Sequence, residues 1–226
     1  MNVELDLEER GSRAAIAGFV FAALHVVGWT MMQKGPSLDA SNEELIAYYG
    51  DPDSRRVALI AALWILPFTA IAFVWFAAAL RDRFVGRRHR EHTLLATVHL
   101  LSAALFVVSI FTVAAAELAL VWMVESSGAA ELDPDSVRSM VALGQAMASL
   151  MALRSAAVFI AITTTRAKRS GLFPGWYSAI SYLVALVLLV MFDLWPPIQL
   201  LMPLWVLATS VVVLKERRLL DLPTGS

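Results

Sequence analysis

Cysteine is missing from this chain of 226 residues. Without a thiol the chain can form neither disulfides nor thiolate metal sites, and cysteine nucleophiles and iron–sulfur clusters are excluded with them. Charged residues are scarce as well, at 16% of the chain, against about 25% in an ordinary globular domain. These shortages, with a net charge of only -1, exclude a secreted disulfide scaffold, a nucleic-acid-binding protein and a disordered chain.

Apolar residues take the place of the missing charge. They make up 59% of the chain, and the mean hydropathy is +0.68. A membrane-spanning helix needs about 17–25 mostly apolar residues, and six stretches meet this length without the alternation of barrel strands. We therefore expect an all-α polytopic membrane protein, residues 1–226 forming one bundle of six transmembrane helices. The predicted spans are about 14–32, 57–80, 93–124, 137–165, 176–192 and 197–214.

The basic residues predict an orientation for these spans. Most of the 18 lysine and arginine residues lie at the chain ends and in the loops after the second and fourth spans. By the positive-inside rule this side faces the cytoplasm, so we expect both termini there, in a bacterial plasma (inner) membrane. The loop after the second span either binds anionic lipid headgroups or acts only as a topology determinant. Its basic members are Arg81, Arg83, Arg87, Arg88 and Arg90.

Two kinds of helix-start pattern lie on the opposite, external side. Ser41 and Glu44 have capping-box spacing, which predicts a short helix at about 42–49. The tetrapeptide Asp-Pro-Asp-Ser occurs at 51–54 and again at 133–136, before the second and fourth spans. Aspartate followed by proline is typical of an N-cap. The less favoured interpretation is that the four carboxylates converge on a divalent cation.

Ionisable residues inside the predicted spans are the best pointers to function, because charge in hydrocarbon is costly. Arg154 lies 12 residues before Arg166, which marks the cytoplasmic membrane interface, and so about 18 Å from it. Glu117 lies eight residues before Glu125, which marks the external interface, and so about 12 Å from it. In a hydrocarbon core of about 30 Å these depths coincide, so we predict that Arg154 and Glu117 pair. The pair would either lock two helices together or form part of a ligand, ion or proton site.

Further polar groups extend this candidate core. His25 lies near the middle of the first span, and His99 lies on the same helical side as Glu117. We predict that these two histidines and Gln145 provide polar contacts on the wall of the site around Arg154 and Glu117. Axial ligation of a b-type haem by the two histidines is a minor alternative, and we expect no cofactor.

The fourth span also carries a stripe of small residues at four-residue spacing, which permits close helix approach and contact with a second copy or a membrane partner. The stripe consists of Gly144, Ala148, Ala152 and Ala156.

Three segments carry a resemblance to a known family. They are Asn-Glu-Glu-Leu-Ile-Ala-Tyr-Tyr at 42–49, Leu-Arg-Asp-Arg at 80–83 and Arg-Ser-Gly-Leu-Phe-Pro-Gly-Trp at 169–176. In these segments and in its layout the chain resembles a family of bacterial, especially actinobacterial, six-helix membrane proteins described only as a domain of unknown function. The resemblance implies a six-helix fold and assigns no functional residue.

The sequence favours a non-enzymatic membrane protein that binds or passes a small or lipidic molecule around Arg154 and Glu117. An alternative is a structural or regulatory subunit that docks to a larger membrane complex. An intramembrane enzyme is disfavoured, because the chain has no nucleotide loop, metal-protease helix motif or serine elbow. Membrane lipid is the expected surrounding partner, and no nucleic acid is expected.

Overall fold

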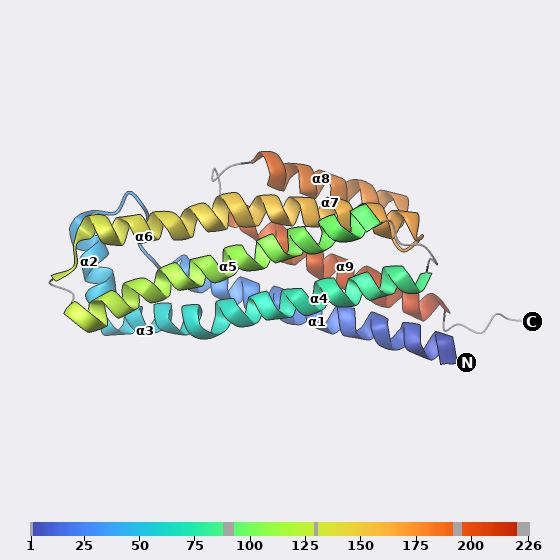
Figure 1. The fold of residues 1–226 in the computed structure, drawn as a ribbon, viewed down its shortest axis with the longest axis horizontal. Coiled ribbons are helices and arrows are strands. Elements are labelled where there is room, and N and C mark those ends of the chain that lie inside the picture. Colours follow the sequence, from blue (N-terminus) through green and yellow to red (C-terminus); the bar gives the residue numbers. More distant parts are fainter. Residues whose placement is uncertain (1, 88–92, 129–130, 192–195, 221–226) are drawn as a thin grey trace, which may run out of the picture.

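A computed structural model of the protein describes residues 2–87, 93–128, 131–191 and 196–220. Every secondary-structure element in these ranges is a helix. The elements run antiparallel in a long bundle (Figure 1). The start of the first helix, α1, and the end of the last helix, α9, lie at one end of the bundle, which we call the terminal end, and α2 lies at the other, the α2 end. In chain order the elements are α1 (Asn2–Met32), α2 (Asn42–Gly50), α3 (Pro52–Ile60), η1 (Ala61–Ile65), α4 (Leu66–Arg87), α5 (Thr93–Ser127), α6 (Pro134–Ala146), η3 (Met147–Ala152), α7 (Leu153–Arg169), α8 (Gly175–Val190), η4 (Pro196–Leu200) and α9 (Leu201–Leu220).

Five helical stretches are long and apolar enough to cross a membrane. They are Ser12–Met32, Pro52–Phe84, Thr93–Ser127, Pro134–Arg169 and Pro197–Lys215. The predicted span at 176–192 corresponds to α8, which is apolar but has only 16 residues. Residues 192–195, at the end of that predicted span and directly after it, lie outside the described residues. Five membrane-spanning helices are therefore the count that length and composition support, and α8 packs on the outside of α7.

The surface of the bundle is apolar where a membrane would surround it. Exposed side chains include Trp75 at 68% and Leu105 at 60%. Buried serine and threonine hydroxyls commonly donate a hydrogen bond to the backbone carbonyl one turn earlier, as Thr69 does to Ile65. An apolar exterior, with buried hydroxyls that commonly bond to the helix backbone, is the arrangement expected in lipid, and the protein is a membrane protein.

The predicted caps form at the α2 end. Ser41 accepts the Glu44 backbone N–H while the Glu44 carboxylate accepts that of Ser41, which completes the capping box of α2. Asp51 caps α3 and Asp133 caps α6, each accepting the N–H three residues on and each followed by proline. Hydrogen bonds from Ser54 and Ser136 hold the pKa of the respective aspartate below its usual value. Each capping prediction is confirmed, and the described residues contain no cluster suited to a metal ion.

The two helices capped by aspartate, α3 and α6, each pass through a π-helical turn before they continue across the bundle. α3 continues through η1 into α4, and α6 continues through η3 into α7. A π turn widens the helix by one residue and is common at functional sites. The turn at η1 ends just before Pro67, and η3 is followed by Leu153 at the start of α7.

Candidate functional site

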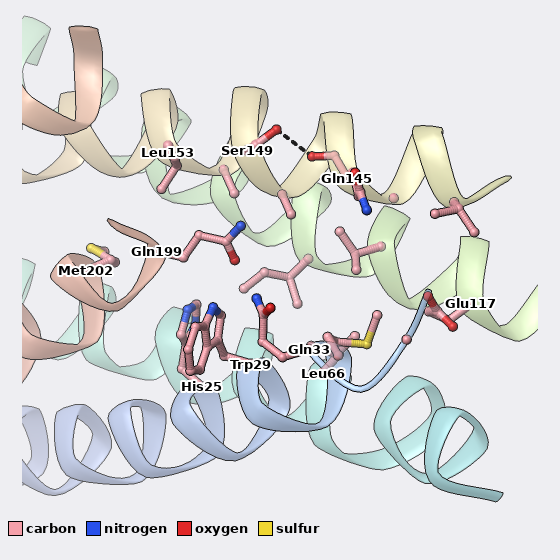
Figure 2. A pocket seen from close by; sticks show the side chains of 18 of the residues that line it. His25, Trp29, Gln33, Leu66, Glu117, Gln145, Ser149, Leu153, Gln199 and Met202 are labelled. Carbon is pink, nitrogen blue, oxygen red and sulfur yellow. Dashed lines mark hydrogen bonds between the residues drawn. The ribbon is translucent and has the colours of Figure 1, made fainter. Parts of the chain in front are cut away.

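A cavity of about 430 Å³ lies inside the bundle, toward the α2 end. α1 packs against α4 and α9, while α6 and η3 pack against α5. The cavity lies between these two groups of helices, as Figure 2 shows. Its size is within the range of pockets that hold small organic ligands.

Each wall of the cavity is one face of a helix. On α5 the lining residues are Phe106, Ile110, Val113 and Glu117, at spacings of four, three and four. On α1 they include His25, Trp29 and Met32, with the same spacing. On the third side they run from Val141 in α6 through η3 to Leu153. At about 1.5 Å per residue, the α5 wall is about 16 Å long, so the cavity is elongated along the bundle.

Several polar groups on these walls have no hydrogen bond within the described part of the chain. The Trp29 indole N–H is buried without a partner. The side-chain amides of Gln33, Gln145 and Gln199, which come from three different elements, likewise make no hydrogen bond there. A polar group in an apolar setting is costly unless water or a ligand satisfies it. The cavity is therefore equipped to hold a molecule with hydrogen-bonding groups.

Glu117 is held in place by a residue from outside the long helices. The Tyr49 hydroxyl, on α2, donates to Glu117 Oε2 at 3.3 Å. Tyr49 is fully buried among Leu45, Leu120 and Val137. Burial, and then the charge of Glu117, raise the pKa of Tyr49 and raise that of its neighbour Tyr48 to about 12. Tyr49 thus remains a protonated donor at neutral pH.

The loop between α1 and α2 covers the cavity at the α2 end. Gln33, Gly35, Pro36 and Ser37 line the cavity from this loop, and Gln33 and Ser37 are exposed. Arg138 on α6 anchors the loop, because its guanidinium donates to the carbonyls of Leu38 and Ala40 and to the Asn42 side chain. Arg138 therefore connects the loop between α1 and α2 to α6, which forms part of the cavity wall.

An aromatic cluster closes the cavity toward the terminal end. The Phe73 ring centroid lies 4.6 Å from that of Phe106 and 4.9 Å from that of Phe159. Phe21 and Phe76 complete the cluster, and these rings are almost fully buried. His25 stacks on Phe106 at its edge, with centroids 6.3 Å apart. Among the described residues, the cavity is therefore a blind pocket that is closed toward the terminal end.

His99 lies beyond this cluster and does not line the cavity. It is fully buried, with Nε2 3.3 Å from the Ala77 carbonyl and Nδ1 3.1 Å from the Thr163 hydroxyl. These contacts join α4, α5 and α7, and both ring nitrogens are engaged. His99 and His25 lie on opposite sides of the aromatic cluster, so they do not form the two axial positions of one haem.

Arg154 and Glu117 are separated by the structure, contrary to the predicted pair. Gly144 lies opposite Ala116, since a Cβ on the glycine would stand 3.8 Å from the alanine Cβ. Arg154 is ten residues further along, or about 15 Å toward the terminal end. It is half-buried, and its Nη1 donates to the Leu150 carbonyl. The two residues would lie at the same depth only if the bundle were about 30 Å long. With 35 residues, α5 is longer than that.

The small-residue stripe faces the interior. Gly144, Ala148 and Ala152 line the cavity, and Ala156 is fully buried below it. The basic cluster at the terminal end is only partly described: Arg83 is buried at 4% exposure, whereas the Arg87 side chain and residues Arg88 and Arg90 lie outside the described residues.

Of the five residues that the sequence placed in a polar core, the cavity brings together His25, Glu117 and Gln145. Sequence reasoning did not select Trp29, Gln33, Gln199 or Tyr49. Trp29 and Gln33 lie one and two turns after His25, at i+4 and i+8, so helical spacing from His25 would have found both. Gln199 and Tyr49 reach the site through tertiary packing, for which the sequence carries no local signal.

The fold and cavity define an all-helical membrane protein with a blind, polar-lined internal pocket. Comparisons with protein-family models, with curated proteins and with solved structures produced no match for this chain.

Proposed function

We propose that this protein binds a small amphipathic or lipidic molecule in the cavity between α1, α5 and α6–η3. The observation that carries the proposal is the combination of apolar walls with polar groups that have no partner among the described residues, among them the Trp29 indole and the Gln199 amide. Such a lining suits a molecule with an apolar body and a few hydrogen-bonding groups. The aromatic closure beyond Phe106 supports binding over free passage.

The site proposed here is centred on Glu117 and His25 and not on Arg154, which is absent from the described lining. The alternative of a docking subunit has less support, because the small-residue stripe expected to meet a partner faces the cavity.

We also infer that the membrane is a bacterial plasma membrane, that α8 completes a six-span topology and that the terminal end faces the cytoplasm. The concentration of lysine and arginine at the chain ends and in the loops after the second and fourth predicted spans supports this orientation.

Binding of phenylbutanol, a neutral amphipathic probe, tests the proposed function by calorimetry in lipid nanodiscs, with protein-free discs as the blank. We expect saturable binding to the wild type. Ala148→Trp narrows the cavity and should weaken binding at least about tenfold. Ala146→Trp makes the same change on the exposed side of the helix and should bind as the wild type does. Equal binding by both variants would contradict the site.

A further inference from the structure

The charges on the described lining of the cavity are unbalanced. Glu117 is the one charged side chain among its described lining residues, and the other polar members are amides, hydroxyls, an imidazole and an indole. Electrostatic attraction is much stronger in a low-dielectric interior than in water. A carboxylate in such a pocket therefore favours a ligand of positive charge over a neutral or negative one of the same shape.

The carboxylate also has a defined place in the cavity. Along the α5 wall Glu117 occupies the α2 end, and Val113, Ile110 and Phe106 follow it toward the aromatic cluster. Figure 2 shows Glu117 at the opposite end of the cavity from His25. The α5 wall is about 16 Å long in total. It offers a carboxylate at one end and mostly apolar contact along the rest of its length.

A second group can assist the carboxylate. Gly144 lies opposite Ala116 on an antiparallel helix, so Gln145 is offset from Glu117 by only about 3 Å along the bundle, toward the terminal end. The Gln145 amide makes no hydrogen bond within the described residues, and its oxygen is an acceptor. An ammonium group has several donors, which the Glu117 carboxylate and an amide oxygen can accept together.

We propose that the cavity selects an amphipathic organic cation, with an ammonium group at Glu117 and an apolar tail along Val113, Ile110 and Phe106. This inference rests on the proposed function and adds the chemical class of the ligand. Tyr49 acts as a positioning residue, because its hydroxyl donates to Glu117 Oε2 and leaves the other carboxylate oxygen for the ligand.

Three matched probes test the charge preference: phenylbutylammonium, phenylbutanol and phenylbutanoate. Their affinities for the wild type are measured by calorimetry in nanodiscs of uncharged phosphatidylcholine, so that the bilayer does not itself select by charge. We expect the ammonium to bind at least about tenfold more tightly than the alcohol, and the carboxylate to bind most weakly. Glu117→Gln keeps the size of the side chain and an acceptor for Tyr49, and it should abolish the preference.

The outcomes distinguish the two proposals. If the alcohol and the ammonium bind equally to the wild type, and Ala148→Trp weakens both, the cavity binds ligands but the cation inference is overturned. If the carboxylate binds best, the inference is overturned as well. If no probe binds to the wild type, both proposals are overturned. Since the three wild-type affinities already decide the charge preference, the test stands even where Glu117→Gln folds poorly.

Discussion

Tyr49 and Glu117 come from parts of the chain with very different surroundings. Tyr49 belongs to the short helix α2, and Glu117 belongs to the longest helix, α5. Their hydrogen bond spans 68 residues of sequence and brings a hydroxyl to a carboxylate that is half-buried in an apolar wall. A buried acceptor that loses its donor retains the full cost of desolvation, so this contact matters for both stability and site geometry.

Tyr49→Phe removes only the hydroxyl that donates to Glu117. We expect the variant to be less stable by about 1–3 kcal/mol, the usual cost of an unsatisfied buried polar group, and to melt at a lower temperature in detergent. Tyr48→Phe is the matched control, because the Tyr48 hydroxyl makes no hydrogen bond within the described residues. A Tyr49→Phe variant as stable as Tyr48→Phe would show that the contact contributes nothing.

His25 and His99 show how little a residue type reveals without its surroundings. Both are histidines in apolar helices, yet His99 is fully buried with both ring nitrogens engaged. His25 faces the cavity and stacks on Phe106. The sequence supports a polar role for each, but only the packing separates the core histidine from the one available to a ligand.

Among the elements, the helix starts at the α2 end follow closely from the sequence. The residues that cap α2, α3 and α6 are all within three positions of the groups they satisfy, so local pattern predicts them well. The π turns η1 and η3 carry no comparable local signal. η3 lines the cavity, whereas no residue of η1 is among the described lining residues.

Asp133→Ala removes the cap of α6, and we expect a lower melting temperature at neutral pH. Hydrogen bonds from the Ser136 hydroxyl and backbone N–H lower the pKa of Asp133 in the folded protein. The charged cap therefore stabilises the fold above the unfolded pKa of about 3.9, and this contribution is lost as the pH falls through the lower folded-state value.

Melting curves between neutral and acid pH check this dependence. The difference between wild type and Asp133→Ala should shrink in acid, while Asp133→Asn, which still caps, should stay close to the wild type near neutral pH. A difference that is constant across the pH range would mean that the carboxylate charge plays no part in the cap.

At the scale of the whole molecule, five helical stretches have the length of a membrane span, and α8 is shorter. The absence of native cysteine makes orientation directly measurable, since a single introduced thiol has no background. Ser37→Cys lies in the exposed loop at the α2 end, and Ser170→Cys lies between α7 and α8 at the terminal end.

An impermeant maleimide added to intact cells should label Ser37→Cys and spare Ser170→Cys, because the terminal end carries most of the basic residues. Lysis should make the second thiol reactive. Labelling of Ser170→Cys alone in intact cells would reverse the orientation, and labelling of both would contradict a simple span for α6–η3–α7.

The sequence by itself determined the apolar helical class, the long spans and the helix caps. Hydropathy and capping act over a few neighbouring residues, so they can be interpreted before any helix meets another. Which polar groups share a cavity was decided only by tertiary structure. The level of Arg154 relative to Glu117 depends on the antiparallel register of α5 against α6–α7, set by packing such as that of Gly144 on Ala116. Small differences in helix length and tilt shift that register by several ångströms, enough to separate one expected pair and to bring Tyr49 and Gln199 to the site.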